Sequence, residues 1–138
     1  MKISEDDIKK IQDYFASQKD VVAVYLYGSF AKGTTNKGSD IDFGVLFDKK
    51  IDSYRRLGEV YSGLPSLNGE PDVRDLDLNY SPVYLLNVIQ GELIYTKDEK
   101  KRINFEVDVM RRFYDTQHLR NISLAYMRKR LQEGTYGY

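Results

Sequence analysis

The chain has 138 residues, 41% of them hydrophobic, and its 21 lysines and arginines balance its 21 aspartates and glutamates. This length suits one domain with one core, and a neutral chain gives no electrostatic reason to expect direct nucleic-acid binding. The sequence has no cysteine and one histidine, His118, which excludes disulfides, thiolate nucleophiles and multi-histidine metal sites. We assign His118 no role, and any metal site must use oxygen ligands, which favours Mg²⁺.

Membrane and export signals are not visible in the sequence. No apolar run approaches the roughly 20 residues that span a bilayer. The first ten residues, MKISEDDIKK, lack the apolar core of a signal peptide. We therefore expect a cytoplasmic protein without membrane contacts.

The chain is expected to begin with a helix followed by a buried strand. Ser4 is suited to a helix N-cap, acidic residues follow it, and apolar residues then recur at helical spacing to about residue 18. The run VVAVYLY, over residues 21–27, is rich in β-branched and aromatic residues and predicts a strand. Gly28 and Ser29 end this strand.

Two carboxylates follow a polar loop over residues 33–39. The sequence DIDFGVLF, over residues 40–47, predicts a second strand, and side-chain alternation places Asp40 and Asp42 on the same face. Like charges at this spacing repel each other, and burying them without a cation is costly. This stretch therefore raises the question of what compensates the two charges.

The rest of the chain predicts further helices and strands around a small sheet. In chain order they are a helix over 53–64, a strand over 73–78, a helix over 82–90, a short strand over 93–95 and a long helix over about 98–132. This order predicts an α/β (α+β) fold, in which helices cover a small mixed β-sheet on one face. We expect a single domain over 1–138, with a core over about 20–96 and a helical C-terminal extension over about 98–133.

A third carboxylate is expected from the strand VRDLDL. Alternation places Asp75 and Asp77 on one face of this strand and its leucines on the other. Asp75 is the first choice, Asp77 is nearly as good, and Asp72 is a weaker third option. One or two Mg²⁺ ions between Asp40, Asp42 and this third carboxylate would turn repulsion into affinity for phosphate oxygens.

The Gly28-Ser29 turn supplies the second part of the predicted site. A glycine without a Cβ lets a phosphate approach closely, while backbone amides and the Ser29 hydroxyl donate hydrogen bonds to it. Lys32 and Lys37 would add positive charge. A lone Asp-x-Asp or a lone Gly-Ser usually has no such role, but together on one strand, turn and strand they predict phosphoryl or nucleotidyl transfer.

These residues resemble a known signature. Gly28-Ser29, ten intervening residues and then Asp40-Ile41-Asp42 is similar to the motif of the polymerase-β-like nucleotidyltransferases, and the short chain resembles their minimal MNT-domain members. The flanking FAKG, LNYSP and NVIQGELIY segments match the same pattern, so the resemblance covers about residues 21–95. The family's third strand carries its acid in a Val-Asp-like context, whereas DVRDLD offers three acids in another register. The third carboxylate therefore stays open.

The resemblance implies a function, a partner and roles for the motif residues. MNT antitoxins are partners of HEPN-domain ribonuclease toxins, which implies a nucleotidyltransferase that moves AMP from ATP to a tyrosine of such a toxin and neutralises it. In this reading Asp40 and Asp42 bind Mg²⁺, Asp75 completes the set and acts as the base, and Gly28 and Ser29 bind the triphosphate.

Two other functions are open at this point. An antitoxin with a weak or vestigial site would act by direct contact, through tyrosines near the C-terminus such as Tyr114, Tyr126, Tyr136 and Tyr138. Ordinary helix packing and a solvated tail explain the same tyrosines. The third function is nucleotidyl transfer to a small molecule, although the chain has little material for the second wall of such a pocket.

Overall fold

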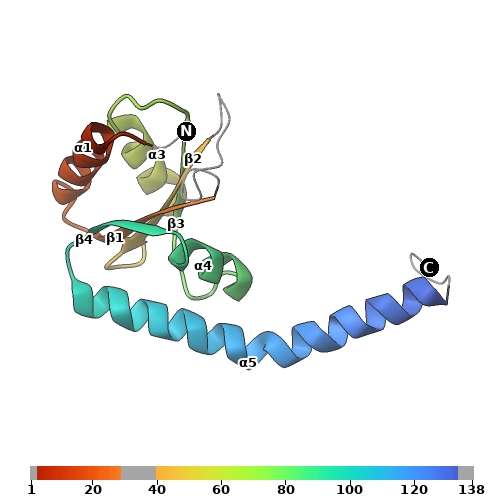
Figure 1. Cartoon of the computed structure of the whole chain (residues 1–138). Coiled ribbons are helices and arrows are strands. Elements are labelled where there is room, and N and C mark those ends of the chain that lie inside the picture. Colours follow the sequence, from red (N-terminus) through yellow and green to blue (C-terminus); the bar gives the residue numbers. More distant parts are fainter. Residues whose placement is uncertain (1–2, 29–39, 134–138) are drawn as a thin grey trace.

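The computed structural model describes residues 3–28 and 40–133 (Figure 1). The elements in chain order are α1 (Glu5–Ala16), β1 (Val21–Tyr27), β2 (Ile41–Phe47), α3 (Ser53–Gly63), β3 (Pro71–Asp75), α4 (Pro82–Ile89), β4 (Glu92–Thr96) and α5 (Glu99–Gln132). The expected helices and the strands at β1, β2 and β4 are confirmed to within a few residues. No helix within the described residues is both long and apolar enough to span a membrane.

The predicted bounds of the third strand, 73–78, are wrong. The strand β3 begins two residues earlier, and its ladder closes where the Leu76 amide donates to the Val45 carbonyl at 3.1 Å. The chain then turns, because an Asp77 carboxylate oxygen accepts from the Asn79 amide at 2.8 Å. The alternation of apolar and charged residues in VRDLDL continues to Leu78, although the strand itself ends at Asp75.

The sheet has the order β3-β2-β1-β4 and is mixed. β1 pairs antiparallel with both β2 and β4, whereas β2 pairs in parallel with β3. All seven residues of β1 are buried, which explains why VVAVYLY is apolar without alternation. β3 and β4 are the edge strands.

Helices cover both faces of the sheet, so the expectation that they cover one face is wrong. Figure 1 shows α1 and α3 on one side of the sheet and α4 and α5 on the other. Phe15 and Val60 pack with Val24 on the first face, while Val88 and Phe105 belong to a second core on the other face. β1 is apolar on both faces, and each face needs its own cover.

The helix α5 is attached to the sheet by its first half. Phe105 and Val109 are its buried residues. The Tyr25 hydroxyl on β1 donates to a carboxylate oxygen of Glu106 at 2.6 Å, and Arg102 lies 2.7 Å from the same oxygen. The second half of α5 extends away from the sheet (Figure 1).

Gly44 in β2 lets α4 pack closely on the sheet, and this contact gives a prediction. A Cβ at Gly44 would lie 2.6 Å from Cγ1 of Val88 and 3.3 Å from Cδ2 of Leu76. We expect Gly44→Ala to lower the free energy of unfolding by about 1–3 kcal/mol, because α4 must shift. Urea denaturation followed by circular dichroism measures this change.

Gly58 in α3 is the matched control. A Cβ there meets nothing within 4 Å, so Gly58→Ala should raise the free energy of unfolding by about 0.5–1 kcal/mol through helix propensity. Equal effects of the two substitutions would contradict the close packing of α4 on β2.

Candidate active site

Asp42 and Asp72 lie side by side on neighbouring strands. The parallel pairing of β2 with β3 sets Asp42 opposite Asp72, and paired strands are about 4.8 Å apart. Both side chains point to the face that α4 covers, because Gly44, two residues after Asp42, contacts Val88 of α4. The two carboxylates therefore form a pair where β2 and β3 begin.

The environment of this pair disfavours negative charge. Burial raises the pKa of Asp42 above its ordinary value, and the neighbouring charges of Asp72 and Asp40 raise it further. Arg74 acts in the opposite direction. Asp40 is exposed just before β2. The structure thus brings Asp40, Asp42 and Asp72 into one electrostatic cluster, and a bound cation would relieve its repulsion.

Gly28, directly after β1, lies against this cluster. Its φ is 73°, and a Cβ placed on it would be 2.4 Å from Oδ2 of Asp42. A glycine is therefore required for both the backbone conformation and the contact with the carboxylate. The other residues predicted to bind phosphate, which are Ser29, Lys32 and Lys37, lie outside the described residues.

Asp75 is on the other face of the sheet, away from Asp42. It pairs with Val45, three positions along from the Asp42 and Asp72 pair, and an odd step reverses the face. Its Oδ2 accepts hydrogen bonds from the Ser53 and Tyr80 hydroxyls, each at 2.8 Å. The structure therefore does not bring Asp75 to the predicted carboxylate site, and it makes Asp75 a link between α3 and the segment before α4.

The structure separates the three acids that the sequence offers as the third carboxylate. Asp77 accepts a hydrogen bond in the turn after β3, and Asp72, the weakest of the three candidates, is the one beside Asp42. The register between the parallel strands β2 and β3 decides which acid lies beside Asp42, and no local sequence pattern specifies that register. Pro71 at the start of β3 was the one available indication that the strand begins early.

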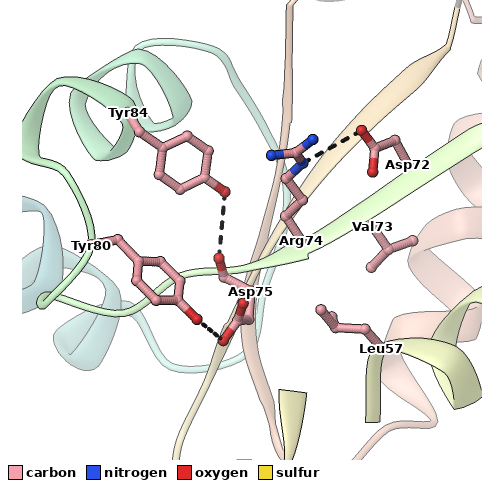
Figure 2. A pocket seen from close by; sticks show the side chains of 7 residues that line it. All are labelled: Leu57, Asp72, Val73, Arg74, Asp75, Tyr80 and Tyr84. Carbon is pink, nitrogen blue, oxygen red and sulfur yellow. Dashed lines mark hydrogen bonds and ion pairs between the residues drawn. The ribbon is translucent and has the colours of Figure 1, made fainter. Parts of the chain in front are cut away.

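A pocket of about 530 Å³ follows the edge strand β3 next to Asp72. Its lining residues are Leu57, Asp72, Val73, Arg74, Asp75, Tyr80 and Tyr84. Figure 2 shows Tyr84 and Arg74 on one side of β3, and Val73, Leu57 and the Asp75 carboxylate on the other, with the Tyr80 hydroxyl pointing to that carboxylate. The pocket therefore lies at the rim of the sheet, with one end at the carboxylate pair.

Arg74 and the tyrosines define the polar part of this pocket. Nε of Arg74 lies 3.4 Å from Oδ2 of Asp72, and the side chain of Arg74 is 59% exposed. The rings of Tyr80 and Tyr84 are 6.4 Å apart at a tilted angle. The Tyr84 hydroxyl donates to the backbone carbonyl of Asp75 at 3.4 Å.

The donor set fits a hard divalent cation. Within residues 3–28 and 40–133, no three acidic or histidine side chains converge into a complete metal site. The adjacent pair of Asp42 and Asp72, with Asp40 nearby, nevertheless offers only oxygen donors and an excess of negative charge. Mg²⁺ and Mn²⁺ prefer such ligands and take their remaining ligands from water and phosphate.

Comparisons with known proteins agree with this geometry. A family model described as "Polymerase beta, Nucleotidyltransferase" matches residues 9–100. The protein adenylyltransferase MntA of Shewanella oneidensis is 27% identical over 95 residues, which make up 69% of this chain and 61% of MntA. The chain thus spans less than two thirds of the length of this relative.

Solved structures share the fold. A toxin-antitoxin structure with AMP-PNP has a TM-score of 0.67 at 22% identity, with 86% of this chain and 95% of the matched chain covered. A chain from a tri-AMPylated Shewanella oneidensis HEPN toxin in complex with MNT antitoxin has a TM-score of 0.63 at 19% identity, with 86% and 93% covered.

The charge cluster predicts that Asp42→Asn makes the protein more stable at neutral pH. The folded state raises the pKa of Asp42, so ionised Asp42 opposes folding at any pH above that pKa. The gain in melting temperature from Asp42→Asn should be largest near pH 7.5. It should shrink as the pH falls towards the ordinary aspartate range, because wild-type Asp42 is then protonated as well.

Differential scanning fluorimetry in the absence of divalent cations measures this gain. Asp13→Asn, at an exposed aspartate on α1, is the control, and it should change stability by less than about 0.5 kcal/mol. A lower melting temperature for Asp42→Asn at pH 7.5 would show that the carboxylate is not electrostatically strained.

Proposed function

Because the chain belongs to the polymerase beta nucleotidyltransferase family, we propose that it is a Mg²⁺-dependent protein adenylyltransferase that acts as an antitoxin. It transfers AMP from ATP to a tyrosine of a HEPN-domain toxin and so neutralises it. The observation that carries this proposal is the Asp42 and Asp72 pair, which lies against the Gly28 turn.

Each part of the site has a distinct task in this proposal. Asp40, Asp42 and Asp72 would hold the divalent cations, and Asp72 takes the place that the sequence interpretation gave to Asp75. Cations held there would supply positive charge for the triphosphate and the leaving group. Gly28 lets the backbone of the turn lie directly against the Asp42 carboxylate, because a Cβ there would be 2.4 Å from Oδ2 of Asp42, and the triphosphate binds along this turn.

The reaction is a substitution at the α-phosphorus of ATP. The phenol oxygen of the acceptor tyrosine forms a bond to the α-phosphorus, and the bond from that phosphorus to the bridging oxygen of the β-phosphate breaks. Pyrophosphate leaves with the bonding electron pair. Asp72, at the end of the pocket, accepts the phenol proton, so that atoms and charges balance.

The comparisons support the choice of acceptor. MntA, the relative at 27% identity, is described as a protein adenylyltransferase. One structure of the same fold is described as a tri-AMPylated HEPN toxin in complex with an MNT antitoxin. A protein acceptor also suits the position of β3 and its pocket, which lie at the rim of the sheet.

Neutralisation by contact is the second candidate function, and the exposed surface of α5 favours it. The second half of this helix carries large apolar side chains that are exposed. They are Leu119, Ile122, Leu124, Tyr126, Met127 and Leu131. Clustered exposed apolar side chains are typical of protein interfaces. Contact through α5 and AMP transfer are compatible in one protein.

AMP transfer is tested with labelled ATP, Mg²⁺ and a HEPN-domain toxin as the acceptor protein. We expect label and a matching gain in mass on a tyrosine of that protein. The double substitution of Asp40→Ala with Asp42→Ala should lower the rate by about 100-fold or more, because metal coordination contributes several kcal/mol. Gel autoradiography and mass spectrometry measure the two quantities.

The double variant also separates the two candidate functions. Label transfer that survives both substitutions would refute the assignment of the carboxylates. Toxin neutralisation by the double variant without label would instead favour contact through α5. Cell growth during co-expression of the toxin with the double variant measures this neutralisation.

The third carboxylate is tested by two matched substitutions. We expect Asp72→Asn to lower AMP transfer by about 100-fold, since Asp72 is beside Asp42. Asp75→Asn should stay within about threefold of wild type, because its amide oxygen can still accept from Ser53 and Tyr80. The reverse order of the two rates would restore Asp75 as the third ligand.

A further inference from the structure

We propose that the pocket along β3 is the acceptor site, and that Arg74 selects a tyrosine with an acidic neighbour. This inference rests on the proposed AMP transfer and adds the direction from which the acceptor arrives and the feature by which it is recognised.

The carboxylate pair lies between two sides of the sheet. Gly28, at the end of β1, is on one side of Asp42, whereas Asp72 and the pocket are on the other. The triphosphate is assigned to the Gly28 side. In an in-line substitution the attacking and leaving oxygens are on opposite sides of the phosphorus. The acceptor oxygen must therefore arrive from the side of β3, where the pocket opens.

The lining suits an aromatic side chain. Tyr84 lines the pocket on the same side of β3 as Arg74 and Asp72, whereas Leu57 and Val73 line it on the other side, where the Tyr80 hydroxyl meets the Asp75 carboxylate (Figure 2). Aromatic rings prefer tilted neighbours, and the volume of about 530 Å³ is within the range of small-ligand pockets. A tyrosine ring that packs against Tyr84 is therefore on the face of β3 that carries Asp72 and Arg74.

Arg74 supplies the charge for recognition. It pairs with Asp72 at 3.4 Å. When Asp72 binds a cation, this pairing weakens, and the guanidinium of Arg74 is left facing the pocket (Figure 2). A carboxylate next to the acceptor tyrosine then becomes its counter-ion, and an arginine binds a carboxylate with two parallel hydrogen bonds.

The test uses two synthetic peptides, Glu-Glu-Tyr-Glu-Glu and Lys-Lys-Tyr-Lys-Lys, as AMP acceptors with Mg²⁺ and ATP. We expect the wild-type kcat/KM to be about tenfold higher for the acidic peptide, and Arg74→Ala to remove this preference through a higher KM. Arg74→Lys should retain part of it. Arg55→Ala, at an exposed arginine on α3, is the control and should retain all of it.

Nucleotide binding is measured separately with AMP-PNP and Mn²⁺ by calorimetry. Arg74→Ala should leave the Kd for AMP-PNP within about twofold, because Arg74 is assigned to the acceptor side. A Kd that rises as much as the acceptor KM would make Arg74 a nucleotide ligand and overturn the inference. An unchanged peptide preference in Arg74→Ala would overturn it as well.

A binding experiment keeps this inference separate from the proposed function. In the presence of AMP-PNP, the acidic peptide should shift the amide resonances of Arg74, Tyr80 and Tyr84 in the spectrum of ¹⁵N-labelled protein. Absence of these shifts contradicts the acceptor site even if AMP transfer occurs. Shifts without AMP transfer to either peptide or to the toxin support the acceptor site and contradict the proposed function.

Discussion

The parallel pairing of β2 with β3 is the constraint on which the candidate site depends. It sets Asp42 opposite Asp72, and it directs Asp75 to the other face. Alternation along β3 places Arg74 on the same face as Asp72, and both residues line the pocket at the rim of the sheet. A shift of one residue would move every side chain of β3 to the opposite face. Two hydrogen bonds hold this register: the Ile41 amide donates to the Glu70 carbonyl just before β3, and the Leu76 amide donates to the Val45 carbonyl just after it.

The protein holds this charged cluster at an energetic cost that the rest of the fold offsets. Asp40, Asp42 and Asp72 repel one another where burial already disfavours the ionised form of Asp42. Two apolar cores, one on each face of the sheet, stabilise the strands on which these acids lie. Functional sites commonly combine such local strain with a rigid frame, and the strain is relieved when the ligand binds.

The sheet and the long helix divide the molecule into two regions with different surfaces. The carboxylates and the pocket belong to the sheet, at the end where β2 and β3 begin. The second half of α5 extends away from that region and exposes apolar side chains (Figure 1). A partner held by α5 would remain near the sheet, which raises the effective concentration of its acceptor segment at the pocket.

The sequence by itself determined the elements, the Gly28 turn and the carboxylates of Asp40 and Asp42 at the start of β2, because these features depend on local periodicity and on residues close in the chain. The unbroken apolar run of β1 is typical of a strand buried on both faces, but the sequence showed neither which helices cover each face nor which acid joins Asp42. Those features depend on the register between β2 and β3 and on the packing of α4 and α5. Contacts between distant segments decide both, and no local pattern encodes them.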